Sequence, residues 1–233
     1  MSAQTIFVTG TDTGVGKTHI SCALLRQLRA QKLKACGYKP VASGCVDTPQ
    51  GLRNDDALAL QEAAATREPY EYINPYAFAP AIAPHLAARA AGVRVKTTQL
   101  DAAHAELAAR YDWLVVEGAG GWLVPLNEDL TFAGWVAQRG WPVLLVVGMR
   151  LGCINHALLS AEAIMRRARL VGWVANVLPP QMAELGDNIE TLKRRMPAPL
   201  LGVMPVGADA PLDLQTLLSR SRERPEIPDA EEP

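Results

Sequence analysis

A glycine-rich segment near the start of the chain carries the residue types needed to bind a phosphate chain. Residues 10–18 read GTDTGVGKT and lie between an apolar, β-branched run and a segment with helical spacing. Glycines let backbone N–H groups converge on phosphate oxygens, and the N-terminus of a following helix adds partial positive charge. In this pattern Lys17 reaches the β- and γ-phosphates, and the Thr18 hydroxyl can hold Mg²⁺. The segment predicts a nucleoside triphosphate site rather than a turn that only caps a helix.

The spacing of this loop and two carboxylate positions refine the prediction. Five residues rather than the usual four separate Gly10 from Gly16, which indicates a particular subclass of phosphate loop. Glu117 ends the apolar run WLVVE, at a strand end where doubly wound sheets place ligands, and a salt bridge there is the weaker alternative. Asp55 and Asp56 open a predicted helix, where capping and metal binding are equally compatible with the spacing.

A second lysine follows the second predicted strand. Lys39 stands in GYKPVASG, and in a parallel sheet it would point to the same rim as the phosphate loop. Together with Ser43 it flanks a turn beside the nucleotide site. A cation there could stabilise charge that develops during phosphoryl transfer, the alternative being an exposed surface lysine.

Short apolar runs alternate with amphipathic stretches along the chain, a pattern typical of a parallel sheet covered on both faces. We therefore expect a three-layer, doubly wound α/β fold of the P-loop NTPase type. Residues 1–218 would form one domain, and the nearly apolar-free residues 219–233 a disordered tail. The expected strands are residues 5–9, 34–41, 113–117, 143–147, 170–176 and 200–204. The expected helices are residues 17–31, 55–65, 85–91, 99–110, 155–168 and 184–196. The helix at 85–91 lies within a stretch, residues 67–92, that is expected to be otherwise irregular.

The composition excludes several classes of protein. Lys and Arg number 23 against 24 Asp and Glu, so the net charge of −1 argues against a nucleic-acid binder or a polybasic membrane anchor. The sequence has no run of 18 apolar residues and no signal-peptide pattern, so we expect a soluble cytoplasmic protein. The spacing of the cysteines favours buried thiols over a metal finger or redox pair; they are Cys22, Cys36, Cys45 and Cys153.

Six segments, in this order and spacing, closely resemble the dethiobiotin synthetases: GTDTGVGKT, GYKPVASG, RNDDALAL, VEGAGGWLVPL, LGCINHALL and GWVAN. The resemblance covers about residues 5–205. It implies ATP-dependent closure of a urea ring, in which CO₂ and 7,8-diaminononanoate give dethiobiotin, ADP and phosphate during biotin synthesis. A carbamate and a carbamic–phosphoric anhydride would be the intermediates. It also implies Mg²⁺ as cofactor, ATP as co-substrate and a homodimer.

The resemblance further implies roles for individual residues. Thr18, Asp56 and Glu117 would be the Mg²⁺ ligands, and Lys17 and Lys39 the catalytic cations beside the phosphoryl group and the carbamate. The implied substrate contacts are Thr13, Ser43, Gly120, Leu151 and Asn155. The implied nucleotide contacts are Gly14, Val15, Gly16, Lys17, Thr18, His19, Asp56, Glu117, Gly118, Ala119, Gly120, Asn176, Pro205, Val206 and Gly207.

Within these sets, Asn176 and residues 205–207 would hold adenine. Residues 151–155 would reach across a dimer interface to the carboxylate tail of the substrate, so that two subunits share each site. Two positions depart from the family pattern. Gly14 stands where the best-known members carry Glu, and Val177 stands where some members carry a polar residue.

Two other functions compete with this interpretation. One is another amide- or ring-forming ligase on the same scaffold, such as the synthetase part of a cobyrinic acid amidase, which a glutaminase domain would accompany. The other is a P-loop switch ATPase of the partitioning or metallochaperone type. We find neither a metal-ligand cluster nor a partner-binding surface of the kind such a switch needs in the sequence.

Overall fold

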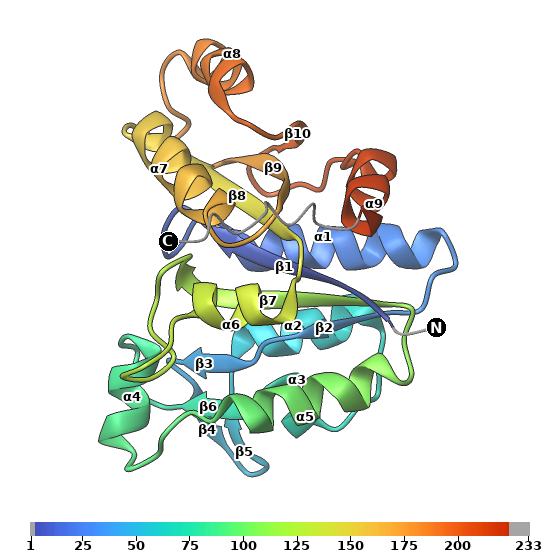
Figure 1. Ribbon diagram of the computed structural model, residues 1–233, viewed down its shortest axis with the longest axis vertical. Coiled ribbons are helices and arrows are strands. Elements are labelled where there is room, and N and C mark those ends of the chain that lie inside the picture. The colour runs from blue at the N-terminus through green and yellow to red at the C-terminus, as the bar shows by residue number, and fades with distance from the viewer. Residues whose placement is uncertain (1–2, 224–233) are drawn as a thin grey trace, which may run out of the picture.

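The computed structural model describes residues 3–223 and contains a six-stranded parallel sheet with helices on both faces (Figure 1). The strand order is β10-β9-β8-β1-β7-β2, and neighbouring strands all run parallel. The strands are β1 (Gln4–Gly10), β2 (Ala35–Tyr38), β7 (Trp113–Gly121), β8 (Val143–Met149), β9 (Leu170–Val177) and β10 (Leu200–Met204). After β1 the chain builds one side of the sheet, and after β7 it builds the other. Ligands bind at such a switch point, outside the carboxyl ends of the strands.

Alternate strand side chains face two separate helical layers. One layer packs on side chains such as Ile6 and Leu144, and it consists of α1 (Lys17–Ala30), α2 (Asp55–Ala64) and α9 (Leu214–Arg222). The other layer packs on side chains such as Phe7 and Leu145. Its helices include α5 (Thr97–Ala108), α6 (Phe132–Arg139), α7 (Cys153–Met165) and α8 (Leu185–Arg195). Burial on both faces explains the uninterrupted apolar runs, and the predicted three-layer, doubly wound α/β fold is confirmed.

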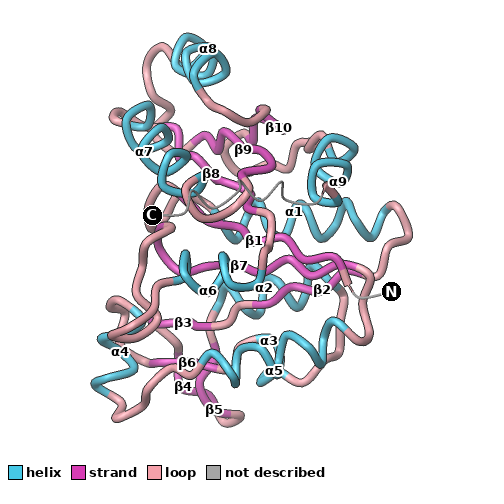
Figure 2. Tube along the Cα trace, viewed as in Figure 1, coloured by secondary structure: helices cyan, strands magenta, loops and turns pink. Residues whose placement is uncertain are grey.

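The prediction of one strand over residues 34–41 is wrong. Strand β2 ends at Tyr38, and β3 (Val41–Ser43) belongs to a separate parallel pair with β6 (Tyr76–Phe78). Pro40 causes the break, because it lacks an N–H group and restricts the backbone of the residue before it. Figure 2 shows the short strands lying beyond β2, apart from the six-stranded sheet. Lys39 therefore lies in the gap between two sheets.

Several short elements escaped the sequence patterns. The stretch after β3 contains a hairpin of β4 (Val46–Thr48) and β5 (Gly51–Arg53). Helix α3 (Tyr70–Ile73) and strand β6 lie in the stretch expected to be irregular, whereas α4 (Pro84–Ala90) matches the helix predicted there. Helix α6 was also missed, because eight residues leave too few turns for a clear period.

The prediction of a disordered tail over residues 219–233 fails over its first residues. Residues 219–222 form the last turn of α9, whose Leu217 is buried and whose N-cap Asp213 accepts a hydrogen bond from the Thr216 N–H group. Disorder is therefore wrong for these residues, and residues 224–233 lie outside the described part of the chain. Within residues 3–223, none of the helices combines the length and apolar character needed to cross a bilayer.

Candidate nucleotide and catalytic site

The phosphate loop connects β1 to α1, and glycine conformations define its shape. Gly14 and Gly16 have φ of 72° and 89°, a region that other residues rarely adopt. A Cβ on Gly16 would lie 2.1 Å from Nδ2 of Asn176, so the amide packs directly against the loop. The same Nδ2 donates to the Val15 carbonyl oxygen at 2.8 Å. The end of β9 therefore holds the phosphate loop in place.

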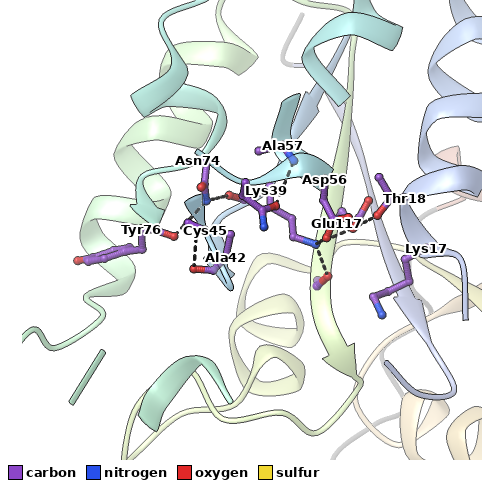
Figure 3. A network of polar contacts seen from close by, with 12 residues as sticks. Lys17, Thr18, Lys39, Ala42, Cys45, Asp56, Ala57, Asn74, Tyr76 and Glu117 are labelled. Atoms are coloured by element: carbon purple, nitrogen blue, oxygen red, sulfur yellow. Dashed lines mark hydrogen bonds and ion pairs between the residues drawn. The ribbon is translucent and has the colours of Figure 1, made fainter. Parts of the chain in front are cut away.

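Lys39 is buried at the centre of a polar cluster beside this loop (Figure 3). Its Nζ donates to Oε1 of Glu117 at 2.6 Å and to Oδ2 of Asp56 at 2.7 Å, with the Gly118 carbonyl oxygen at 3.4 Å. Thr18 Oγ1 donates to the same Glu117 oxygen at 2.9 Å. Burial opposes the charge of Lys39, but the two carboxylates outweigh it and raise the pKa of Lys39. Lys39 is therefore a charged, 3% exposed residue, and the alternative of a surface lysine is wrong.

Lys17 brings a second cation into the same cluster. It is buried, and its Nζ donates to the Asp12 carbonyl oxygen at 3.2 Å. Burial first, and then the positive charge of Lys39, lower the pKa of Lys17 to about 8. Two ammonium groups in one partly dehydrated space repel each other, so an anionic ligand between them is favoured.

At the start of α2, one residue caps the helix and a different residue pairs with Lys39. Asn54 is the N-cap, since its side chain accepts a hydrogen bond from the Ala57 N–H group at 3.2 Å. Asp55 is exposed, whereas Asp56 turns toward Lys39. The sequence left capping and ligand binding open for the two aspartates, and the structure assigns the cap to their neighbour.

The residues predicted to hold Mg²⁺ have the donor atoms that this ion prefers. Glu117 is fully buried, and its Oε2 receives no hydrogen bond from any residue in the described part of the chain. A buried carboxylate oxygen without a partner is costly, and a cation would satisfy it. The Thr18 hydroxyl and the Asp56 carboxylate belong to the same cluster, which gives the all-oxygen donor set typical of Mg²⁺ sites. The residues present therefore fit the ion.

A pocket of about 330 Å³ opens over these groups. It is lined by Thr13, Gly14, Gly16, Lys17, Thr18, Lys39, Ala42, Ser43, Asn54, Asp56, Glu117, Ala119 and Gly120. All of these residues except Ala42 and Asn54 were predicted from the sequence. Asn54 carried a usable signal, because Asn directly before a helix start is a preferred N-cap. Of the remaining predicted contacts, Val15 is a buried residue of the loop itself, and Gly118 contributes the carbonyl oxygen near Lys39.

The segment predicted to cross a dimer interface lies outside this pocket in the single chain. Leu151, in the turn that leads into α7, is 95% exposed, and Asn155, in the first turn of that helix, is also exposed. Leu151 lines a second pocket of about 730 Å³, which Gly14 also borders. The Arg150 guanidinium pairs with the carboxylate of Asp12 and so links this turn to the phosphate loop. No local pattern in the sequence could reveal this pair, because 138 positions separate its members.

The predicted adenine segment also lies outside the pocket. It follows β10, whose last residue Met204 is in register with Asn176, and its exposed residues are Pro205, Val206 and Gly207. The carboxylate of Asp209 anchors this segment to α1. It accepts from His19 Nε2 at 3.0 Å and from Arg26 at 2.7 and 3.0 Å. His19 therefore contacts the loop after β10, a contact that sequence spacing did not reveal.

The chain is similar to known proteins over nearly its whole described length. A family model described as an AAA domain matches residues 4–210. The ATP-dependent dethiobiotin synthetase BioD of Pseudomonas paraeruginosa is 54% identical over 206 residues, which cover 88% of this chain and 90% of that protein. The ATP-dependent dethiobiotin synthetase BioD 1 of Escherichia coli K12 is 48% identical over 211 residues, covering 90% and 94%. The chain belongs to the dethiobiotin synthetase family. The predicted resemblance and the prediction of a carbon–nitrogen ligase are thereby confirmed.

More distant solved structures show the fold alone. A ParA family ATPase from Chlorobium tepidum has a TM-score of 0.54 at 16% identity, covering 94% of this chain and 91% of that one. The cell division protein FtsY of Thermotoga maritima has a TM-score of 0.52 at 16% identity, covering 95% and 69%. Both agree with a P-loop α/β fold. At such identity they do not favour the switch ATPase over the ligase.

Proposed function

We propose that this chain uses ATP and Mg²⁺ to close the ureido ring of dethiobiotin from 7,8-diaminononanoate and CO₂ in the cytoplasm. The observation that carries the proposal is the buried Lys39 ammonium between Asp56 and Glu117, next to the phosphate loop. A cation that is shielded from water and held in place can stabilise negative charge, and this reaction creates an oxyanion at each step.

The nucleotide end of the site would orient the phosphates. N–H groups of residues 14–18 and the N-terminus of α1 face the phosphate chain in loops of this type, and Lys17 reaches the β- and γ-phosphates. Thr18, Asp56 and Glu117 would hold Mg²⁺, which neutralises phosphate charge when bound. Asn176 and residues 205–207 would contact adenine.

The substrate end would hold the diamine near Thr13, Ser43 and Gly120, which line the pocket. An uncharged amine attacks CO₂ and loses a proton, giving a carbamate. A carbamate oxygen attacks the γ-phosphorus, and ADP leaves. The second amine then attacks the carbonyl carbon of the anhydride and loses a proton, which closes the ring and expels phosphate. Proximity replaces a protein nucleophile throughout.

Lys39 would stabilise the carbamate and the transferring phosphoryl group. Its three hydrogen-bond acceptors are unequal, since the Gly118 carbonyl oxygen is at 3.4 Å and the two carboxylates are at 2.6 and 2.7 Å. The long contact is the one that a substrate oxygen would replace most readily. Lys39 could then bind the oxyanion without leaving its carboxylate partners.

An activity assay tests the proposal directly. The purified chain is incubated with ATP, Mg²⁺, bicarbonate and 7,8-diaminononanoate, and dethiobiotin and ADP are both quantified. We expect ADP release to require both the diamine and bicarbonate, in equal amounts with dethiobiotin. ADP release that is independent of the diamine, with no dethiobiotin, would instead favour the switch ATPase.

A homodimer with shared sites is the second part of the proposal. Leu151 is nearly fully exposed although it is apolar, and the turn it occupies leads directly to Asn155. We propose that each site takes Lys39 from one subunit and Asn155 from the other. A two-fold interface would repeat this arrangement at both sites.

Subunit mixing tests the shared site. A Lys39→Ala chain is mixed with an Asn155→Ala chain, each nearly inactive alone. In a heterodimer one site carries both changes and the other carries neither, so about a quarter of all sites should recover full activity after random reassortment. Subunit exchange is checked by native mass spectrometry. Complete exchange without recovery of activity would reject the sharing of sites.

A further inference from the structure

The backbone of Lys39 lies between two strands and takes part in the pairing of neither. The register of β2 with β7 ends at Tyr38, and β3 begins only at Val41. The last residue of α3 and the residue that follows it supply the missing partners. The Lys39 N–H group donates to the Ile73 carbonyl oxygen at 2.8 Å, and Asn74 Nδ2 donates to the Lys39 carbonyl oxygen at 2.7 Å. The position of Lys39 therefore depends on side chains and backbone outside the main sheet.

Asn74 is 3% exposed, and its side chain is fully engaged beside Lys39 (Figure 3). Besides the bond to Lys39, Nδ2 donates to the Tyr76 carbonyl oxygen at 3.0 Å. Its Oδ1 accepts from the Tyr70 hydroxyl at 3.0 Å. An asparagine with both Nδ2 protons donated and its oxygen accepting is held in one orientation.

The Tyr70 hydroxyl continues these contacts to the start of α2. Its oxygen accepts from the Asn54 N–H group at 2.8 Å, and Asn54 is the N-cap of that helix. Asp56 lies in the first turn of the same helix and accepts from Lys39 Nζ at 2.7 Å. The contacts thus form a closed ring that runs from the carbonyl of Lys39, through Asn74, Tyr70 and α2, back to its ammonium group.

We propose that Asn74 and Tyr70 are positioning residues that set the Lys39 ammonium against the Asp56 carboxylate before substrate arrives. The ring fixes both ends of Lys39 relative to the helix that carries Asp56. A displacement of a catalytic group by about 1 Å can lower the rate about 100-fold. Hydrogen bonds that hold the Lys39 ammonium group in place can therefore affect catalysis strongly. This inference rests on the proposed role of Lys39 in the ligase reaction.

A double-mutant cycle tests the inference. The variants are Asn74→Ala, Lys39→Ala and the pair, and kcat, KM and the ATP dissociation constant are measured for each. We expect Asn74→Ala to lower kcat about 10- to 100-fold while ATP binding changes little, since Asn74 lies outside the nucleotide contacts. In the Lys39→Ala background the same change should have little further effect, because no ammonium group remains to be positioned.

A less disruptive substitution, Tyr70→Phe, tests the inference even if the Asn74→Ala variant does not fold. Tyr70→Phe removes only the hydroxyl that bridges Asn54 and Asn74, and it should lower kcat about 3- to 10-fold, again only when Lys39 is present. Tyr111→Phe is the matched control. Its hydroxyl bonds to Thr66 and Glu68 outside the ring, so its kcat should equal that of the unchanged chain. Near-UV circular dichroism monitors folding of every variant.

The outcomes separate the inference from the proposed function. Equal losses from the Asn74 or Tyr70 change with and without Lys39 would overturn the inference and leave the role of Lys39 intact. Normal turnover of Tyr70→Phe and of folded Asn74→Ala would do the same. Normal turnover of Lys39→Ala would overturn the proposed role of Lys39 and the inference together. A chain that makes no dethiobiotin under any condition would overturn the proposed function first.

Discussion

The phosphate end of the site and the segment after β10 are held by the fold in different ways. At the phosphate end, Lys39 and Glu117 are 3% and 0% exposed and bond to each other, whereas the Asp56 side chain on the other side of Lys39 is partly exposed. After β10, Val206 is 49% exposed, and the segment is tied to α1 through Asp209 and Arg26, whose side chains are nearly half exposed. One region is fixed by desolvated contacts and the other by contacts that water can replace.

The difference separates the parts of the site that must be rigid from those that can adjust. Buried ion pairs cannot lose one partner without leaving an uncompensated charge, so their geometry is strongly constrained. Exposed pairs contribute about 0–1 kcal/mol and are weakened by salt. We therefore expect chemistry to depend steeply on the first region and binding to depend mildly on the second.

The largest effect is expected from Glu117→Gln, which keeps the shape of the side chain and removes its charge. This change deprives Lys39 and the proposed Mg²⁺ of a carboxylate, so kcat should fall by at least about 10²–10³-fold. Initial rates across a Mg²⁺ titration measure it, with thermal denaturation as a check on folding. Glu106→Gln, at an exposed position on α5, is the control. Unchanged turnover at limiting Mg²⁺ would exclude Glu117 as a ligand.

A smaller but clear effect is expected from Gly16→Ala. The new Cβ would lie 2.1 Å from Asn176 Nδ2 and would occupy a backbone with φ of 89°, so ATP affinity should fall at least about tenfold. Gly14→Ala is a matched control, because its φ of 72° is also positive but its Cβ would meet nothing within 4 Å. Calorimetric titration with ATP compares the two. Equal losses of ATP affinity in the two variants would mean that the loop conformation depends on the positive φ of its glycines and not on packing against Asn176.

A mild effect is expected from Asp209→Asn in the exposed region. Loss of the contacts to Arg26 and His19 should loosen the segment after β10 and weaken ATP binding about two- to fivefold. Binding of inorganic tripolyphosphate, which has no base, should not change. The loss should shrink at high salt, and Asp187→Asn on α8 provides an exposed control. A loss of tripolyphosphate binding as well would contradict a role confined to the base.

The last prediction concerns His104, which lies beside the amino end of β1 and outside both regions compared above. We expect it to affect stability and not catalysis. Its Nε2 lies 2.9 Å from Oγ1 of Thr5, and burial lowers the pKa of His104 to about 4. Unfolding restores a pKa near 6.5, so the unfolded state binds more protons between pH 6.5 and pH 4. The free energy of unfolding should therefore decrease as the pH is lowered through this window, by up to about 3 kcal/mol.

Urea denaturation at several pH values measures this dependence. In His104→Gln the fall between pH 7 and pH 4 should be shallower, since the group that takes up the proton is gone. The exposed His156→Gln variant should keep the slope of the unchanged chain. An identical pH dependence in His104→Gln and the unchanged chain would contradict the assignment.

Elements of the fold that depend on a local sequence pattern could be predicted, whereas elements that depend on long-range packing could not. Buried strands such as β8 and the amphipathic α1 were predictable because their signals lie within a single short window. The division of residues 34–41 into two sheets was not predicted, although Pro40 was visible, because a proline does not show where the chain goes next. Strand β6 depends on pairing with β3, so neither strand has a signal of its own.

The same contrast between local pattern and long-range packing holds within the site. The sequence by itself determined the phosphate loop, because residues 10–18 are contiguous and glycine, lysine and threonine act there through local geometry. Only the tertiary structure decided the surroundings of Lys39, whose partners Asp56, Asn74 and Glu117 lie 17, 35 and 78 positions away. Such contacts arise when the sheet closes and water is excluded, and their strength comes from that exclusion. A linear pattern carries residue types and spacings, but which distant groups share a desolvated space depends on how the layers pack.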